Sequence, residues 1–335
     1  MGNCCSTAHN RGRSRAKKSR LEALNMEETS HEGIKTVGTT SCRELIPSNS
    51  ALCMCVLTWN MNGKVSSEDL IRLVGGNRNF DLFVVGLQEV PRGNNMAQLL
   101  QEALVDTHRL VGEAIMQSLQ LFIFGLKNWR SYTKDVRVEK LAVGGLGGLI
   151  GRKKGAVAMS INFKQVHMLF INCHLSAHAR NVEERNCQFQ QISHSLEKKR
   201  NAFARPYHIK VWLGDLNYRM QGIKTQPARS LIQKDQHRLL TSRDQLLQQA
   251  ERGQVFNGYC EGILAFKPTY KYNIGSSDYD TSYKVRVPAW TDRILYKIEK
   301  LDNVDATLHS YESLDCIYTS DHKPVKAHIC LNFES

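Results

Sequence analysis

Long apolar runs are missing from this 335-residue sequence. No stretch reaches the ~18–20 consecutive apolar residues that a bilayer-crossing helix needs. The first residues also lack the apolar segment of a secretory signal peptide. These two absences exclude a membrane-spanning protein and argue against a secreted one.

Paired cysteine spacing is also absent. The ten cysteines are scattered, and none forms the Cys-x-x-Cys pattern of a zinc site or the density of a disulfide scaffold. We therefore expect reduced thiols in a cytosolic protein. Cys53 and Cys55 alternate along a predicted strand, so they are expected to share one face and to pack in the core.

Acidic residues are missing from the first twenty positions, which carry six Lys and Arg residues. This arm accounts for much of the formal net charge of +13, and a basic excess favours an anionic partner such as nucleic acid, a phosphorylated small molecule or a membrane surface. We predict that residues 1–50 form a disordered basic arm and that residues 51–335 form one catalytic domain.

Beyond the arm, short apolar runs rich in β-branched and aromatic residues predict buried strands. Two longer segments with spaced apolar residues, Val182–Arg200 and Ala228–Ala250, predict amphipathic helices. Strands interspersed with helices indicate an α/β domain. The predicted strands are Leu52–Trp59, Leu82–Leu87, Leu121–Phe124, Ala156–Phe163, Val166–Cys173, His208–Leu213, Ile294–Ile298 and Val325–Cys330.

Polar clusters follow or border several of these strands. If the strands lie side by side, the clusters meet at one rim, where ligand sites of such folds usually lie. We therefore expect five side chains to emerge close together: Asn60, Glu89, His174, Asp215 and Asn217.

This inventory suits hydrolysis of a phosphate ester, which needs a hard cation, a group that orients or deprotonates water, and donors to the phosphoryl oxygens. Mg²⁺ prefers one or two carboxylates and keeps several waters. Glu89, helped by Asn60 or Asn62 and by Asp321, is a sufficient ligand set.

The remaining polar residues supply the other two requirements. Asp215 is a candidate to orient or deprotonate the attacking water, with Asn217 fixing it by hydrogen bonds. His322 is a candidate donor to the phosphoryl oxygens, with Asp292 holding its ring and favouring its charged form. His174 would contact the scissile phosphate from another side. For His178 we favour a hydrogen-bonded structural role.

At these residues the chain resembles the inositol polyphosphate 5-phosphatases, within the magnesium-dependent phosphoesterases that include deoxyribonuclease I and the abasic-site endonucleases. The resemblance covers roughly residues 52–332. It rests on Trp-Asn-Met-Asn-Gly at 59–63, Gln-Glu-Val at 88–90, His-Leu-Ser-Ala-His at 174–178, Gly-Asp-Leu-Asn-Tyr-Arg at 214–219, Pro-Ala-Trp-Thr-Asp-Arg-Ile-Leu at 288–295 and Ser-Asp-His-Lys-Pro-Val at 320–325.

The resemblance implies a four-layer α/β sandwich, in which two packed mixed β-sheets are flanked by helices, and the same roles for the residues named above. It further implies that four residues hold a neighbouring 4-phosphate through charge-assisted hydrogen bonds: Tyr270, Lys271, Lys284 and Arg286.

The chain departs from the family pattern at two positions. Thr291 stands where the family often has Cys, and Lys153 stands where an Asn commonly precedes Lys-Gly. We expect Thr291 to be harmless, whereas Lys153 puts an inherited role for that loop residue in doubt. In length and N-terminus the chain looks most like the small plant members.

The N-terminus fits the myristoylation pattern, with Gly2 as acceptor and Ser6 at the expected place. Cys4 and Cys5 are candidates for palmitoylation. One myristoyl chain binds membranes only marginally, and stable anchoring needs a second signal. Acylated cysteine and the basic arm would each supply one. We expect a cytoplasmic protein held peripherally on the cytosolic face of the plasma membrane or an endomembrane.

The leading hypothesis is a Mg²⁺-dependent phosphatase that removes the 5-phosphate of phosphoinositides. The chief expected substrate is phosphatidylinositol 4,5-bisphosphate, with the 3,4,5-trisphosphate and soluble inositol trisphosphate as further substrates. The alternatives are a metal-dependent nuclease of the same fold and a catalytically inactive phosphoinositide-binding adaptor. We expect a monomer without a nucleic-acid partner.

Overall fold

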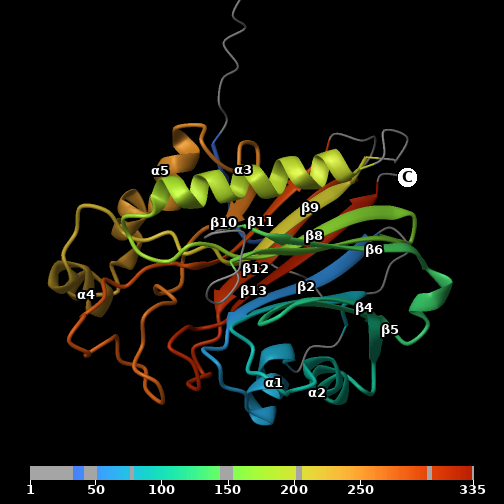
Figure 1. Ribbon diagram of the computed structural model, residues 1–335, viewed down its shortest axis with the longest axis horizontal. Helices are drawn as coiled ribbons and strands as arrows, with labels where there is room; N and C mark the ends of the chain where they lie inside the picture. The colour runs from blue at the N-terminus through green and yellow to red at the C-terminus, as the bar shows by residue number, and fades with distance from the viewer. Residues whose placement is uncertain are drawn as a thin grey trace, which may run out of the picture. The chain divides into compact units, whose positions relative to one another are not determined.

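The computed structural model describes residues 33–40, 51–75, 79–143, 154–200, 206–299 and 304–333. Within them two β-sheets pack face to face, and helices cover both outer faces (Figure 1). Helix α3 (Val182–Lys199) lies across the outer face of one sheet, and α1 (Ser67–Val74) and α2 (Met96–Ala103) lie against the other. This confirms the predicted four-layer sandwich of two mixed sheets flanked by helices.

The first sheet has seven strands in the order β1-β10-β11-β9-β8-β7-β6. Among the described residues, its parallel pairs are β8 with β9 and β1 with β10. The strands are β1 (Lys35–Val37), β6 (Thr133–Ala142), β7 (Gly155–Phe163), β8 (Val166–His174), β9 (Ile209–Asp215), β10 (Cys260–Gly262) and β11 (Asp292–Ile298).

The second sheet has six strands in the order β12-β13-β2-β3-β5-β4, with β2 and β3 parallel. The strands are β2 (Ala51–Asn60), β3 (Leu82–Gln88), β4 (His108–Met116), β5 (Leu119–Leu126), β12 (Val304–Ser313) and β13 (Val325–Phe333).

The sequence of strand β2 is almost continuously apolar because both faces of the strand are buried. Leu52, Met54 and Val56 face the core between the two sheets. Leu57 and Trp59 face outward, where α1 and α2 cover them. A strand buried on both faces needs apolar residues at odd and even positions alike. The helices on the other sheet, α3 and α5 (Gln245–Glu251), cover a third apolar cluster in the same way.

All eight predicted strands are present. The strands that the apolar pattern missed are β1, β4, β6, β10 and β12. Among them β1, β4, β6 and β12 are the four sheet edges, and β10 has only three residues. Most of β6 is exposed, so its sequence lacks the apolar run that marks a buried strand.

The helix predicted at Val182–Arg200 is confirmed as α3. The single helix predicted at Ala228–Ala250 is wrong, because the segment divides into α4 (Thr225–Gln233), a 3₁₀ segment (His237–Arg243) and α5 (Gln245–Glu251). Asp235 has a φ of 56°, which a helix cannot continue. Asp244 then starts α5 as its N-cap, since its side chain accepts a hydrogen bond from the backbone of Leu247.

Within the arm predicted at residues 1–50, the described residues 33–40 include the strand β1. The strand β1 pairs with β10, and Ile34 and Val37 pack against apolar clusters of the domain. Two backbone hydrogen bonds, from Lys35 to Tyr259 and from Ile263 to Val37, fasten the segment. The rest of the arm, with its predicted acylation sites, lies outside the described residues.

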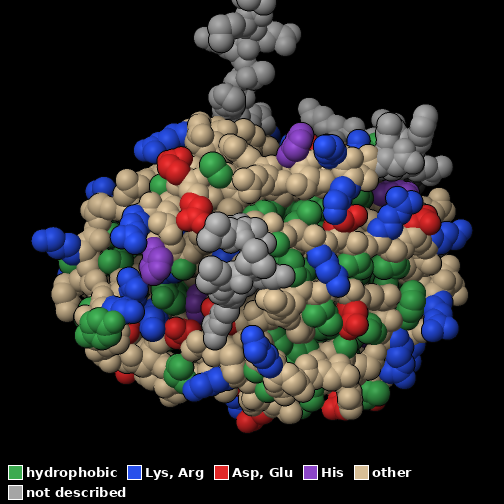
Figure 2. Space-filling view, in the orientation of Figure 1, with side chains coloured by type: hydrophobic (Ala, Val, Ile, Leu, Met, Phe, Trp, Pro, Cys, Tyr) green, Lys and Arg blue, Asp and Glu red, His purple; other side chains and the backbone are tan. Residues whose placement is uncertain are grey.

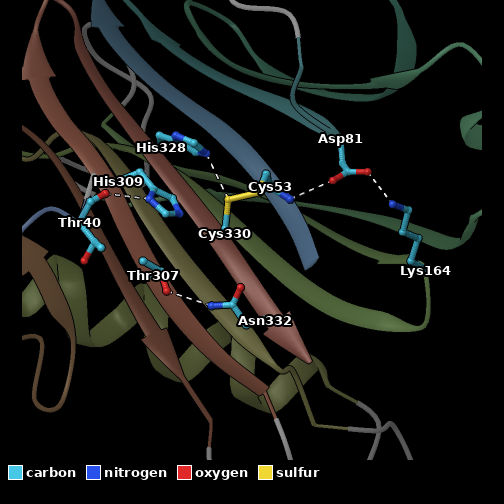
Figure 3. Close-up of a disulfide and its surroundings, with 9 residues drawn as sticks. All are labelled: Thr40, Cys53, Asp81, Lys164, Thr307, His309, His328, Cys330 and Asn332. Carbon is cyan, nitrogen blue, oxygen red and sulfur yellow. Dashed lines mark hydrogen bonds and ion pairs between the residues drawn. A yellow bond between two sulfur atoms is a disulfide. The ribbon is translucent and has the colours of Figure 1, made fainter. Parts of the chain in front are cut away.

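The cysteines divide into two groups. Cys55 and Cys173 are free and buried, as expected of core thiols. Cys53 and Cys330, however, form a disulfide, which contradicts the expectation of reduced thiols (Figure 3). The two residues face each other across the antiparallel pair of β2 and β13, with Cα atoms 4.0 Å apart, so their sulfur atoms meet on the outer face of the sheet. None of the described helices has the length and apolar character to span a membrane.

Candidate active site

The strand ends bring the predicted polar residues to one rim. Asn60 and Gln88 end the parallel pair β2 and β3, and His174 and Asp215 end the parallel pair β8 and β9. Asp292 begins β11 directly opposite Asp215. Three of these strand-end residues, Asn60, His174 and Asp215, border a cavity of about 120 Å³. Its lining residues are Asn60, Asn62, Glu89, Lys154, His174, Ala177, Asp215, Asn217, Arg219, Tyr270, Asp321 and His322.

The backbone turns sharply where the chain leaves these strands. Asn62, Glu89 and Asn217 have φ values of 49°, 52° and 57°. Asn tolerates this left-handed region, whereas Glu rarely adopts it, and such residues cluster at functional sites. Gly214 has a φ of 138°, and a Cβ there would lie 2.1 Å from the carbonyl oxygen of Cys173. Only glycine therefore lets β9 approach β8 this closely beside the cavity.

A buried amide network ties the two sheets together beneath the cavity. Gln88 Nε2 donates to Asn172 Oδ1 at 2.7 Å, and Asn172 Nδ2 donates to the carbonyls of Leu87 and Gln120 at 3.2 and 2.7 Å. These bonds cross from β3 and β5 to β8. They fix the end of β3, and with it Glu89, relative to the first sheet.

Asp215 is almost fully buried, and both of its oxygens are held. Asn60 Nδ2 donates to Oδ2 at 3.0 Å, and the backbone N–H of Asn217 donates to Oδ1 at 3.0 Å. Burial alone would raise the pKa of this carboxyl. The contact with His174 and the charge of His322 outweigh burial and hold the pKa of Asp215 below its usual range. The residue is therefore a fixed anion.

The imidazole of His174, in contrast, is held in its neutral form. Burial, followed by the nearby Lys154 charge, lowers the pKa of its imidazole. Lys154 Nζ is in hydrogen-bond contact with His174 Nε2, and an ammonium group can only donate. Nε2 must then carry the lone pair when this contact is made. His174 is thus a neutral imidazole beside the anionic Asp215, whose Oδ2 lies 3.4 Å from Nε2.

Asp292 and His322 form the predicted pair. His322 Nδ1 donates to Asp292 Oδ2 at 2.9 Å, and the hydroxyls of Thr269 and Thr291 donate to the same oxygen. Burial disfavours the imidazolium, but the Asp292 carboxylate more than compensates and raises the pKa of His322 to about 10. Thr291 therefore takes part in the network as a hydroxyl donor, whereas Lys153 lies outside the described residues.

A second cavity of about 240 Å³ adjoins the first, and Ala177, Arg219 and Tyr270 line both. Lys284 and Arg286 line it, so the structure places these predicted anion-binding residues beside the first cavity. In Figure 2, Lys and Arg side chains are spread over the visible face, including the left side, on which α4 lies in Figure 1.

Two predicted residues are placed differently from expectation. Lys271 is not among the residues that line the second cavity, and its Nζ lies 3.5 Å from Asp321 Oδ2. Exposed His178 lines that cavity, and burial followed by the charge of Arg286 lowers the pKa of its imidazole. The structural role expected for the His178 side chain is thus not what the geometry favours.

Sequence reasoning gave no role to two residues of the site, Lys154 and Arg219. The guanidinium of Arg219 lies 4.3 Å from the ring centroid of Tyr270, and it donates to the side-chain oxygen and, at 3.2 Å, to the carbonyl of Asn217. Arg219 ends the Gly-Asp-Leu-Asn-Tyr-Arg motif, so its position was a usable signal. Lys154 offered none, because its contact with His174 depends on the pairing of β7 with β8.

Comparisons with known proteins agree with this geometry. Residues 57–328 match Endonuclease/Exonuclease/phosphatase family 2. The chain is 55% identical to type IV inositol polyphosphate 5-phosphatase 11 of Arabidopsis thaliana, over 95% of this chain and 93% of that protein. It is 33% identical to human phosphatidylinositol 4,5-bisphosphate 5-phosphatase A, over 85% of this chain but only 31% of the human protein.

A solved structure of an inositol polyphosphate 5-phosphatase domain is also similar to this chain. The inositol polyphosphate 5-phosphatase domain of SPsynaptojanin, in complex with inositol (1,4)-bisphosphate and calcium ion, superposes with a TM-score of 0.72 at 30% identity. The match covers 84% of this chain and 86% of that one. Taken with the strand-end site, these similarities show that the chain is an enzyme and belongs to the inositol polyphosphate 5-phosphatases.

Proposed function

We propose that this enzyme removes the 5-phosphate of phosphoinositides, chiefly phosphatidylinositol 4,5-bisphosphate. The 3,4,5-trisphosphate and soluble inositol trisphosphate are proposed as further substrates. One observation carries the proposal: a cavity with the residues for phosphate hydrolysis adjoins a basic cavity, and Arg219 and Tyr270 line both. A head group with phosphates on neighbouring carbons would place one phosphate in each. The name of the human relative, a phosphatidylinositol 4,5-bisphosphate 5-phosphatase, supports this choice.

We also propose Mg²⁺ as the cofactor. The cavity fits this ion because four of its lining residues, Glu89, Asn60, Asn62 and Asp321, carry side-chain oxygens, the ligand type that a hard cation prefers. Bound there, the ion would neutralise charge on the phosphoryl oxygens. The calcium ion in the SPsynaptojanin structure supports a divalent cation at such a site. The Asp321 carboxylate also lies 3.5 Å from the ammonium group of Lys271.

The charge states of the residues around the cavity then indicate the role of each in the reaction. Asp215 is a weak base because its pKa is depressed, so we assign it chiefly to orienting the attacking water, with proton uptake late in the reaction. Asn60 and Asn217 hold its two oxygens in place. His322, protonated at neutral pH, donates from Nε2 to a phosphoryl oxygen while Nδ1 stays on Asp292. His174 lies on the other side of Asp215 and contacts the scissile phosphate.

Substituting Asp292→Asn is expected to change the pH dependence of the reaction. In the unaltered enzyme the active imidazolium form of His322 persists until the pH rises through about 10, so kcat/KM should decline only there. Without the carboxylate, the His322 pKa should fall toward its ordinary 6.5, and the alkaline decline should move to lower pH by more than one unit. Rate profiles between pH 5 and 10 measure this. An unchanged alkaline limb would show that His322 is not the group titrating.

Removing the basic residues of the second cavity should impair recognition of a neighbouring phosphate. We expect Lys284→Ala with Arg286→Ala to lower kcat/KM for phosphatidylinositol 4,5-bisphosphate by about 10²–10⁴-fold, since hydrogen bonds to charged groups contribute ~1.5–3 kcal/mol each. Activity on phosphatidylinositol 5-phosphate should change less than threefold. Lys134→Ala, an exposed lysine on β6, is the control. Equal losses on both lipids would contradict a 4-phosphate role.

We further propose that the N-terminus anchors the enzyme to the cytosolic face of a membrane through acyl groups on Gly2, Cys4 and Cys5 and through the basic arm. The sequence pattern supports this, and an anchor would hold the enzyme beside a lipid substrate. In cells, Gly2→Ala should move most of the protein from the membrane to the soluble fraction. The matched control is Gly38→Ala, at a described glycine with open space around a Cβ. Unchanged membrane association of Gly2→Ala would refute the anchor.

A further inference from the structure

The disulfide of Cys53 and Cys330 lies within a cluster of sulfur and imidazole groups. His328 and Cys330 alternate on β13, so they share the outer face of the sheet with Cys53. His328 Nε2 lies 3.2 Å from Cys330 Sγ. All three residues are buried: Cys53 is 9% exposed, His328 is 7% exposed and Cys330 is 2% exposed. Figure 3 shows the rings of His309 and His328 on the same side of the disulfide.

The spacing of these atoms suits a metal ion once the disulfide is opened. Sγ of Cys53, Sγ of Cys330 and Nε2 of His328 lie within 4.8 Å of one another. Tetrahedral zinc, with Zn–S of about 2.3 Å and Zn–N of about 2.0 Å, separates sulfur from nitrogen by about 3.5 Å and two sulfurs by about 3.8 Å. The sulfur–nitrogen contact is already near that value. The two sulfurs, which are bonded to each other in the disulfide, must move apart.

His309 lies beside His328 and is the candidate for the fourth ligand. Its ring lies 4.7 Å, centroid to centroid, from that of His328. His309 Nδ1 is bonded to the carbonyl oxygen of Thr40 at 2.9 Å, and a carbonyl can only accept. Nδ1 therefore carries the proton, and Nε2 is the atom with the free lone pair. A carbonyl that fixes the tautomer in this way is the usual outer partner of a metal-binding histidine.

We propose that the dithiol form of this protein binds a zinc-class divalent cation through Cys53, Cys330 and His328, with His309 as the fourth ligand. Soft thiolates and imidazoles select such ions over Mg²⁺, which prefers oxygen. The site is separate from the catalytic cavity, because Cys53 precedes Asn60 by seven strand residues, or about 23 Å at ~3.3 Å per residue. Disulfide and metal are mutually exclusive states of the same two sulfurs.

A dithiol reductant converts the disulfide state into the dithiol state that binds the cation. The reductant gives two electrons and two protons to the Cys53–Cys330 bond and becomes a disulfide itself, leaving two thiols on the protein. Cation binding then releases both thiol protons, so affinity should rise with pH. The neighbouring thiol of Cys55 is different, because burial raises its pKa to about 12 and keeps it protonated.

Cobalt titration of the full-length protein tests the site directly. With reductant removed after reduction, one equivalent of Co²⁺ should produce sulfur-to-cobalt charge-transfer absorption, and Zn²⁺ should abolish it. The oxidised protein should show none, and thiol titration should count two fewer free thiols in it. Oxygen ligands of the catalytic cavity cannot give this absorption, so cobalt bound there does not interfere.

Variants assign the ligands. Cys53→Ser and Cys330→Ser should abolish the charge-transfer absorption, and His328→Gln, which keeps both thiols, should weaken Co²⁺ binding at least tenfold. His309→Gln should also weaken it. Cys187→Ser removes an exposed free thiol and should change nothing. Circular dichroism checks that each variant is folded.

Two results would overturn the proposal. The first is that reduced protein, with both thiols free, binds no Co²⁺ through sulfur. Cys53 and Cys330 would then serve only as a structural disulfide. Alternatively, His328→Gln could bind as tightly as the unaltered protein, which would remove imidazole from the ligand set.

Discussion

Replacing Asp215 with Asn is expected to lower kcat by about 10³-fold or more while leaving the fold intact. The Asp215 carboxylate accepts hydrogen bonds from Asn60 and from the backbone of Asn217, which fix its position in the cavity. It lies close to both His174 and His322. Losing a positioned group that acts on the nucleophile typically costs 10²–10⁴-fold. Asn keeps the size of the side chain, so the packing around it should persist. Initial rates of phosphate release measure the effect.

The control for this substitution is Asp235→Asn, at an exposed turn distant in sequence from the motifs, which should retain full activity. Thermal unfolding separates a catalytic effect from a structural one. If Asp215→Asn retained more than a tenth of kcat, Asp215 could not be the residue that orients the nucleophile. If the variant unfolded near room temperature, the lost rate would instead reflect stability.

Removing divalent metal should abolish turnover, and Glu89→Gln should raise the Mg²⁺ concentration that gives half-maximal rate at least tenfold. Glu89 is held at the rim by a left-handed backbone and lines the cavity with Asn60 and Asn62. A neutral amide binds Mg²⁺ much more weakly than a carboxylate does. Mg²⁺ titration of the chelator-treated protein measures the shift.

Glu113→Gln, an exposed residue on β4, is the matched control and should leave the Mg²⁺ dependence unchanged. Full activity of the unaltered protein in excess chelator would contradict the proposed cofactor. A Glu89→Gln variant with lower kcat but the same Mg²⁺ dependence would instead assign Glu89 to another role.

The predictability of this site has a physical basis. Strands β2, β3, β8 and β9 are buried on both faces, so their sequences are continuous apolar runs that end abruptly in polar residues. Parallel neighbours end at the same rim, which placed Asn60, Glu89, His174 and Asp215 together. The edge strands β4, β6 and β12 carry no such signal, because solvent covers part of their surface.

Contacts that depend on strand register could not be read from the sequence. Lys154 meets His174 because Gly155 pairs with His174 across β7 and β8. Cys53 and Cys330 are 277 residues apart, and only the register of β2 with β13 brings them together. Cysteine spacing was therefore uninformative for this pair.

The central claim is that this enzyme hydrolyses the 5-phosphate of an inositol head group. Purified protein should be incubated with Mg²⁺ and phosphatidylinositol 4,5-bisphosphate, and the remaining lipid should be identified by the position of its phosphate. Phosphatidylinositol 4-phosphate is the expected product, formed by the unaltered protein and not by Asp215→Asn. Phosphatidylinositol 5-phosphate as the product, or no phosphate released from any 5-phosphorylated inositol, would contradict it.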